Sequence, residues 1–394
     1  MTVEVVIALG VRTPRGKGSP RGALHQVPSL ALVTSLLDAL VARGLRPAAV
    51  QDVLLGCATQ VDEQGTNLAR TAILAAGWDC AVPGLMLNRF CASGIEAVSL
   101  AAARVRSGES ELLVAGGVES VSRVPAFSDR GPLYHDPALA TRVGSIHMGV
   151  AADLVATLDG VTRDALDDYA EASRRKAQAA HAAGAFADAL VPVAGLDHDE
   201  LLDGAPDREA LRALPPLFAD RADELAVVAA RYPKAAPLRH LHTKGNSPAL
   251  ADAAALLVIG ERGAVERAGL VPRARVLGSA SCAVEPVIML TAGQLALERA
   301  LERCGLAPRD LAVVAFAEAF AALCLRLQAA LDLDHDRLNP HGGTIALGHA
   351  FGATGAILTL DAVAALSRQG ARYGAVAVSG AAGLGAALIL ERVA

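Results

Sequence analysis

The sequence predicts an α/β fold, and three observations support this prediction. Short apolar runs alternate with longer helical stretches along most of the 394 residues, as expected for strands that are joined by helical crossovers in a largely parallel sheet. Apolar residues make up 53% of the chain but aromatic residues only 3%, and 37 residues are glycine, so small aliphatic side chains must form a closely packed core. The two halves of the chain also repeat one order of elements.

The first half begins this order. The runs VEVVIALG, DVLLGCA, GLMLNRF and LLVAGGV are predicted strands, and helices are expected at 30–43, near 67–76 and across SGIEAVSLAAARVRSG. A charge at Glu4 inside the apolar start, without a cleavage-site pattern, predicts a first strand rather than a signal peptide.

The region 119–241 interrupts the rhythm with long polar connections and one amphipathic helix at 163–182, which is typical of an inserted loop domain. The rhythm returns at ALADAAALLVIG and repeats over 274–394. The uncharged stretch 373–390 approaches membrane length, but its alternation and its glycines predict two buried strands around a tight turn. We therefore expect an N-terminal half (1–118 with 250–270), a loop domain (119–249) and a C-terminal half (271–394).

Composition argues against several classes of partner. The net charge is -5 and no long run of like charges occurs, so we expect no nucleic acid and no membrane surface as partner. The six cysteines show neither CxxC pairs nor regular spacing, so we expect neither a disulfide framework nor a metal site. A reducing, cytoplasmic location is the corresponding expectation.

Two segments that pair in the internal repeat carry candidate chemistry, NRFCASGIEAV and GGTIALGHAFGATGAIL. Cys91 precedes a helix, whose dipole and free N–H groups would stabilise a thiolate. His349 lies between glycines before another helix and is suited to take a proton from a thiol. At equivalent helix starts, the two side chains would meet at a pseudo-twofold axis. The alternatives are a small buried cysteine and a hydrogen-bonded turn histidine, while a nucleotide loop is disfavoured because its glycine motifs are missing.

Together the segments LNRFCASGIEAV, GGVESVSR, HMGVAADLVA, TKGNSPALADAAALLVIG, AEAFAAL and NPHGGTIALGHAFGATGA closely resemble the thiolase family. The resemblance covers essentially the whole chain, including VRTPRGKGSPRGAL and GLGAALILE. It implies a thiolase fold, in which two pseudo-symmetric βαβαβαββ halves form five layers and a loop domain that binds coenzyme A is inserted. It also implies a homodimer formed along the edge strand near Cys91, or a homotetramer.

The resemblance further implies an acyltransferase that acts on acyl-CoA or 3-oxoacyl-CoA thioesters by thiolytic cleavage or Claisen condensation. Coenzyme A is then substrate or product, and no cofactor or metal is bound permanently. Cys91 matches the acyl-carrying nucleophile, His349 matches the histidine that activates it, and the backbone N–H groups of Cys91 and Ala381 match an oxyanion hole. The substrate-binding positions fall on His147, Met148, Ser247 and Phe320.

Departures from the family pattern fall mainly on the second half-reaction. Ser379 stands where the family has a second cysteine, and a hydroxyl is a far weaker acid than a thiol. Ala317 replaces the asparagine that holds a water in the other oxyanion hole. Ala350 replaces a proline, Pro248 replaces a serine that contacts coenzyme A, and Lys244 replaces a small residue. The segment 219–241 is longer than in the shortest family members.

Three functions follow from these matches and departures. The first is an ordinary thiolase in which water or Ser379 replaces the missing base. The second is an acyltransferase or thioester hydrolase that passes the acyl group from Cys91 to an acceptor other than a carbanion. The third is a non-catalytic protein that binds acyl-CoA, against which the presence of both Cys91 and His349 argues.

Overall fold

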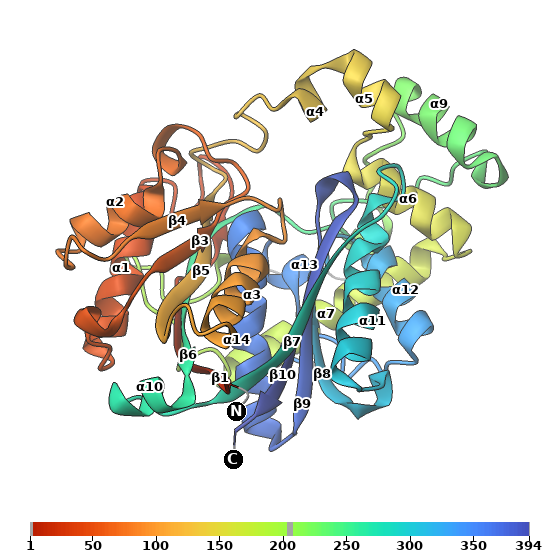
Figure 1. Cartoon of the computed structure of the whole chain (residues 1–394). Coiled ribbons are helices and arrows are strands. Elements are labelled where there is room, and N and C mark those ends of the chain that lie inside the picture. Colours follow the sequence, from red (N-terminus) through yellow and green to blue (C-terminus); the bar gives the residue numbers. More distant parts are fainter. Residues whose placement is uncertain (1–2, 203–207, 394) are drawn as a thin grey trace.

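The computed structural model describes residues 3–202 and 208–393. Its strands form one continuous sheet in the order β4-β3-β5-β6-β1-β7-β10-β9-β8, with β2 paired to β6 (Figure 1). The strands are β1 (Val5–Arg12), β2 (Gly16–Lys17), β3 (Val53–Gly56), β4 (Gly84–Leu87), β5 (Leu112–Ser120), β6 (Ala251–Glu261), β7 (Ala274–Ala283), β8 (Leu311–Phe316), β9 (Tyr373–Ser379) and β10 (Leu384–Arg392).

Strand pairing confirms the repeated architecture. In the first half, β3 runs parallel to β5, and β6 is antiparallel to β5 and β1; in the second half, β8 runs parallel to β9, and β10 is antiparallel to β9 and β7. The halves join where β1 pairs with β7. The sheet is thus mixed, whereas the sequence predicted a largely parallel sheet. A tight turn joins β9 to β10, and strands that are joined in this way run antiparallel.

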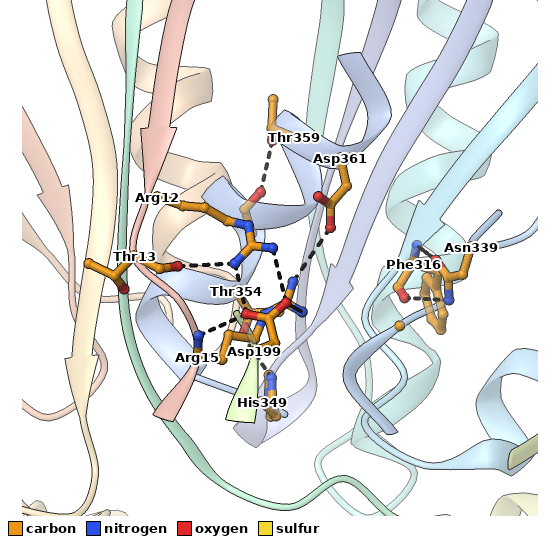
Figure 2. Close-up of polar contacts among 12 residues, drawn as sticks. Arg12, Thr13, Arg15, Asp199, Phe316, Asn339, His349, Thr354, Thr359 and Asp361 are labelled. Carbon is orange, nitrogen blue, oxygen red and sulfur yellow. Dashed lines mark hydrogen bonds and ion pairs between the residues drawn. The ribbon is translucent and has the colours of Figure 1, made fainter. Parts of the chain in front are cut away.

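The sheet edge of the second half is completed without a full strand. Leu338 forms a parallel bridge to Val314 of β8, as β4 pairs with β3 in the first half. The Asn339 side chain then accepts a hydrogen bond from the Phe316 N–H at 2.7 Å and donates one to the Phe316 carbonyl at 3.0 Å (Figure 2). An amide side chain therefore satisfies the backbone groups at the end of β8.

Helices form the remaining layers. Figure 1 shows α3 and α14 between the two parts of the sheet, α1 and α2 outside one part, and α11 and α12 outside the other, which gives the five predicted layers. The helices are α1 (Ser29–Ala42), α2 (Leu68–Ala75), α3 (Ser93–Arg106), α4 (Pro132–His135), α5 (Pro137–Val143), α6 (Met148–Leu158), α7 (Arg163–Ala182), α8 (Arg208–Arg212), α9 (Ala222–Arg231), α10 (Arg262–Arg267), α11 (Ala292–Cys304), α12 (Ala321–Leu331), α13 (Thr344–Leu347) and α14 (Phe351–Gln369).

Several sequence predictions of single elements are confirmed. The amphipathic pattern at 163–182 is α7 with the same bounds, and it begins where the Thr162 hydroxyl accepts a hydrogen bond from the Ala165 N–H. The stretch 373–390 is the β9–β10 pair, and no helix among the described residues is long and apolar enough to cross a membrane. The three domain boundaries stay predictions, and residues 1–2, 203–207 and 394 within those domains lie outside the described residues.

Candidate active site

Cys91 lies in a tight turn between β4 and α3. Phe90, just before it, has a left-handed backbone with φ of 49°, which is unusual for a bulky residue. The Ser93 hydroxyl holds the turn, because it donates to the Phe90 carbonyl at 2.6 Å and accepts from the Arg89 N–H at 2.8 Å. The turn leaves Cys91 buried, with only 4% of its surface exposed, on the wall of two cavities.

His349 occupies the equivalent position before α14. Its N–H donates to the Ala249 carbonyl and its carbonyl accepts from the Ala251 N–H at the start of β6, with N···O distances of 2.8 and 3.1 Å. Its Nδ1 lies 2.9 Å from the Thr354 hydroxyl, while its buried Nε2 has no hydrogen-bond partner among the described residues. The ring therefore keeps one nitrogen available on a side chain that lines the same cavity as Cys91.

Two glycines let the two helix starts come together. A Cβ atom on Gly94 of α3 would lie 2.5 Å from the Gly352 carbonyl oxygen of α14, and a Cβ atom on Gly352 would lie 2.7 Å from the Cα of Cys57. A larger residue at Gly94 would push α3 and α14 apart, and one at Gly352 would push α14 away from the turn after β3. The close approach brings Cys91 and His349 to one site.

Two cavities meet at Cys91. The large cavity has a volume of about 480 Å³ and the small cavity about 270 Å³. Every residue singled out from the sequence as a site residue lines one or both. The large cavity is lined by Cys91, His147, Met148, Ser247, Phe320, His349 and Ser379, and also by Lys244 and Pro248; the small cavity is lined by Cys91, Met148 and Ala381.

Burial favours the protonated form of the Cys91 thiol. Burial and the charge of Glu119 raise the pKa of Cys91 to about 12, although the backbone N–H groups of Cys91 and Ala381 act in the opposite direction. The backbone N–H groups expected from the helix start therefore do act on the sulfur, but in the unliganded site desolvation has the larger effect on its pKa. The same N–H groups are positioned beside the sulfur, where an oxyanion would form.

The histidine is neutral near pH 7. Burial, together with the nearby charge of Arg15, lowers the pKa of His349 to about 4. Arg15 belongs to a buried cluster in which Asp199 accepts hydrogen bonds from both guanidinium arms of Arg12, at 2.8 and 2.9 Å, and from the Arg15 N–H at 2.8 Å (Figure 2). Arg15 also lies 3.5 Å from Asp361 of α14. The cluster thereby ties the segment around Asp199 to β1 and α14.

Ser379 is engaged in backbone hydrogen bonds. Its hydroxyl donates to the Leu290 carbonyl at 2.6 Å and accepts from the Gly293 N–H at 3.0 Å, and the residue is 1% exposed. These bonds fasten the end of β9 to the start of α11. The hydroxyl proton is thus held by a carbonyl group and does not point freely into the cavity.

The far side of the large cavity has an aromatic wall. The His147 Nδ1 accepts the Gly149 N–H at 3.0 Å at the start of α6, and the His147 ring lies 5.1 Å from the ring of Phe218. Phe218 in turn lies 5.9 Å from Phe320 in an edge-to-face arrangement. The Ser247 hydroxyl nearby is buried without a partner among the described residues, so a bound ligand would satisfy it.

Sequence reasoning missed several residues of this site. Glu119 of β5 accepts hydrogen bonds from the N–H groups of Ala58, Thr59 and Gly352 at 2.8, 3.1 and 2.9 Å, and thereby joins the turn after β3 to the start of α14. Thr354 was also missed, although its place five residues after His349 was a usable signal. Among the described residues, no group of three or more His, Cys, Asp or Glu side chains could hold a metal ion.

Comparison with known proteins agrees with this geometry. The family described as "Thiolase, N-terminal domain" matches residues 5–262, and "Thiolase, C-terminal domain" matches residues 270–392. The chain belongs to the thiolase family. As a thiolase, it is an acyltransferase whose substrates are coenzyme A thioesters.

Full-length relatives extend the match. This thiolase is 36% identical to a 3-oxoadipyl-CoA/3-oxo-5,6-dehydrosuberyl-CoA thiolase of Escherichia coli (strain K12), with 99% of this chain and 100% of the relative covered. It is 38% identical to a beta-ketoadipyl-CoA thiolase of Pseudomonas aeruginosa, with both chains fully covered. A Bacillus anthracis acetyl-CoA acetyltransferase structure superposes with a TM-score of 0.86 and 31% identity, over 100% of this thiolase and 99% of that chain. The predicted family, fold and reaction class are confirmed.

Proposed function

We propose that this thiolase cleaves or forms 3-oxoacyl-CoA thioesters through an acyl-enzyme on Cys91. The observation that carries the proposal is that a buried thiol and a neutral imidazole with a free Nε2 line one cavity, with two backbone N–H groups beside the sulfur. A nucleophile, a base and an oxyanion hole are the groups that acyl transfer requires.

In the proposed acylation, the His349 Nε2 takes the thiol proton as the Cys91 sulfur bonds to the substrate carbonyl carbon. The carbonyl oxygen becomes negative and accepts the N–H groups of Cys91 and Ala381. When the substrate is an acyl-CoA, its C–S bond then breaks and the departing coenzyme A thiolate takes the proton from His349. When the substrate is a 3-oxoacyl-CoA, the bond between C2 and C3 breaks and the C2 carbanion takes the proton, which releases acetyl-CoA.

The large cavity is the proposed site of the coenzyme A moiety. Lys244 lines this cavity and its positive charge suits the phosphates of coenzyme A. The Ser247 hydroxyl, which has no hydrogen-bond partner among the described residues, suits the amide groups of the pantetheine arm. Met148, Phe218 and Phe320 supply apolar contacts for the same arm. Pro248 has no N–H, so the position where the family has a serine donates no hydrogen bond to the ligand.

A second candidate function is favoured by one observation. The Ser379 proton is bonded to the Leu290 carbonyl, and Ala317 has no side chain that could hold a water. Both features weaken carbanion formation, while they leave acylation of Cys91 by an acyl-CoA intact. The alternative is an acyltransferase or thioester hydrolase that passes the acyl group from Cys91 to a different nucleophile.

Two measurements separate these functions. Intact-mass spectrometry after mixing with acetyl-CoA is expected to show one acetyl adduct, which Cys91→Ala abolishes. Cleavage of acetoacetyl-CoA by added coenzyme A, measured in the same preparation, identifies the carbon–carbon reaction. An adduct without cleavage favours the alternative, and the absence of an adduct contradicts both functions.

We also propose that the protein works in the cytoplasm as a homodimer. The described cysteines are all free, which suits a reducing compartment. The edge strand β4 carries Leu85, whose exposed fraction is 38%, and an unpaired apolar edge is suited to pairing with a second copy. Sedimentation of the purified protein would distinguish a monomer, a dimer and a tetramer.

A further inference from the structure

The two cavities that meet at Cys91 differ in charge. The large cavity contains Lys244 and two histidines. Among the described residues that line the small cavity there is no Lys, Arg or His, and one residue, Asp129, is charged. The small cavity also contains Ala381, whose N–H faces the Cys91 sulfur. An acyl group whose carbonyl oxygen meets that N–H can extend its tail into the small cavity, away from the coenzyme.

The walls of the small cavity are aromatic in a chain that is poor in aromatic residues. Four of the twelve Phe, Tyr and Trp residues of the chain line it, namely Phe90, Phe127, Tyr134 and Phe351. The rings of Phe127 and Tyr134 lie 4.2 Å apart, and those of Phe90 and Tyr134 lie 6.3 Å apart at 89°. A cavity of about 150 Å³ holds benzene, so about 270 Å³ has room for a phenyl-sized group.

Backbone conformations at these rings mark the cavity as a built feature. Phe90, Phe127 and Phe351 have positive φ angles of 49°, 64° and 27°. Bulky side chains rarely adopt this region, and such strain persists where the surrounding structure imposes it, commonly at ligand sites. Three of the four aromatic side chains therefore reach the cavity through unfavourable backbone geometry.

The polar atoms of the small cavity suit an uncharged ligand. The Tyr134 hydroxyl is buried without a hydrogen-bond partner among the described residues. Burial raises the pKa of Tyr134 above its usual range, so the hydroxyl is a neutral donor. A carboxylate placed here would find no cation among the described lining residues, and the one charged residue near it would be the exposed carboxylate of Asp129.

We propose that the small cavity binds the acyl tail and selects an uncharged tail of aryl size over a tail that ends in a carboxylate. The proposal rests on the Cys91 acyl-enzyme of the proposed function. It separates this chain from the relatives whose names specify 3-oxoadipyl or beta-ketoadipyl substrates. Selection arises here both from aromatic contact with the favoured tail and from repulsion of the disfavoured one.

The test compares acylation rates of Cys91 by intact-mass spectrometry with four thioesters. Hexanoyl-CoA and adipoyl-CoA form a matched pair that differs in the terminal group, 3-phenylpropanoyl-CoA tests the aryl tail, and acetyl-CoA has no tail. We expect hexanoyl-CoA and 3-phenylpropanoyl-CoA to acylate Cys91 at least about tenfold faster than adipoyl-CoA. This series uses the unmodified protein, so it does not depend on the folding of any variant.

Two variants locate the selection. Asp129→Asn is expected to lower the ratio of the hexanoyl-CoA rate to the adipoyl-CoA rate by at least about threefold. Asp38 is an exposed carboxylate on α1, so Asp38→Asn is the matched charge control and should leave this ratio unchanged. Leu139→Trp fills the small cavity and is expected to lower the ratio of 3-phenylpropanoyl to acetyl rates by about tenfold.

The outcomes are distinguishable. If acetyl-CoA forms no adduct on Cys91, the proposed function itself fails. If acetyl-CoA forms the adduct but adipoyl-CoA acylates as fast as hexanoyl-CoA, the acyl-enzyme stands and the proposed selection is overturned. An unchanged 3-phenylpropanoyl to acetyl ratio in Leu139→Trp would overturn the placement of the tail in the small cavity.

Discussion

The His349 Nδ1 atom, just before α14, lies 2.9 Å from the Thr354 hydroxyl in the first turn of that helix. The hydroxyl can accept a hydrogen bond from Nδ1–H, and this bond is compatible with both protonation states that a cysteine–histidine pair passes through. When Nδ1 donates to Thr354, Nε2 carries the lone pair that faces the cavity. When the ring has taken the thiol proton, Nδ1–H keeps its partner and Nε2–H can donate to a substrate oxygen.

Thr354→Val tests this positioning role. The valine has nearly the same shape but leaves Nδ1 without a partner, so acylation of Cys91 by acetyl-CoA is expected to slow by about 10- to 100-fold. Thr354→Ser restores a hydroxyl and should stay within about threefold of the parent. A valine variant as fast as the serine variant would show that the hydrogen bond does not orient the ring.

The pH dependence of acylation should be unusually flat on the acid side. With a pKa of about 4, His349 stays an available base far below the usual titration of histidine near 6.5. The acylation rate is therefore expected to hold from about pH 8 down to about pH 5 and to fall as the pH approaches 4. The acylation rate can be followed across this range by quenching the reaction and measuring the adduct by mass spectrometry. If the His349 ring were not desolvated, the rate would instead fall to half its maximum near pH 6.5.

The same pKa shift predicts how stability changes with pH. The neutral ring is favoured in the folded state, since its pKa there lies below the unfolded value. The stabilisation is fully present above about pH 6.5 and is lost as the pH falls toward 4. The free energy of unfolding, measured in urea, should fall less over that pH interval in His349→Gln than in the parent. An equal fall in both proteins would contradict the assignment.

Ser379 should prove to be a structural hydroxyl and a position that limits the carbon–carbon reaction. Ser379→Ala leaves the Leu290 carbonyl and the Gly293 N–H unpaired, so it should cost about 1–3 kcal/mol of stability without raising cleavage of acetoacetyl-CoA. Ser379→Cys supplies a stronger acid at the same place and should raise that cleavage by about 100-fold. Parent cleavage already near a typical turnover of about 10 per second, unchanged by either substitution, would contradict this view.

Cysteine labelling should follow exposure and not catalytic position. Cys80 is exposed, whereas Cys91 is buried and its pKa is raised to about 12. Brief iodoacetamide treatment near neutral pH is therefore expected to modify Cys80 before Cys91, because the thiolate is the reactive form. Peptide mapping that finds Cys91 labelled first would show that the free protein holds a thiolate there after all.

Ala382 gives a prediction about stability beside the proposed oxyanion hole. It has φ of 57° next to Ala381, and left-handed backbone costs a residue with a Cβ atom roughly 1–2 kcal/mol. Ala382→Gly is expected to raise the free energy of unfolding in denaturant by about 0.5–1 kcal/mol. This value is the relief of strain minus the cost of the conformational entropy that glycine loses on folding. Ala387→Gly, in the middle of β10, is the control and should destabilise it.

Much of this thiolase was determined by local patterns in its sequence. Apolar runs and helical periodicity located α1, α2, α7 and the β9–β10 pair, because burial on one face imposes a spacing that can be read along the chain. Cys91 and His349 were identifiable because reactive side chains stood before small-residue helices in equivalent repeats. The motifs then indicated the family.

Only the tertiary structure decided how those residues behave. The protonated thiol and the neutral imidazole result from desolvation and from the charges of Glu119 and Arg15, which no spacing in the sequence encodes. The small cavity gathers Phe90, Phe127 and Tyr134 around Cys91 together with Phe351, which lies more than half the chain away. Burial and contact are properties of packed surfaces, so residues far apart in sequence set the chemistry that local patterns alone could not.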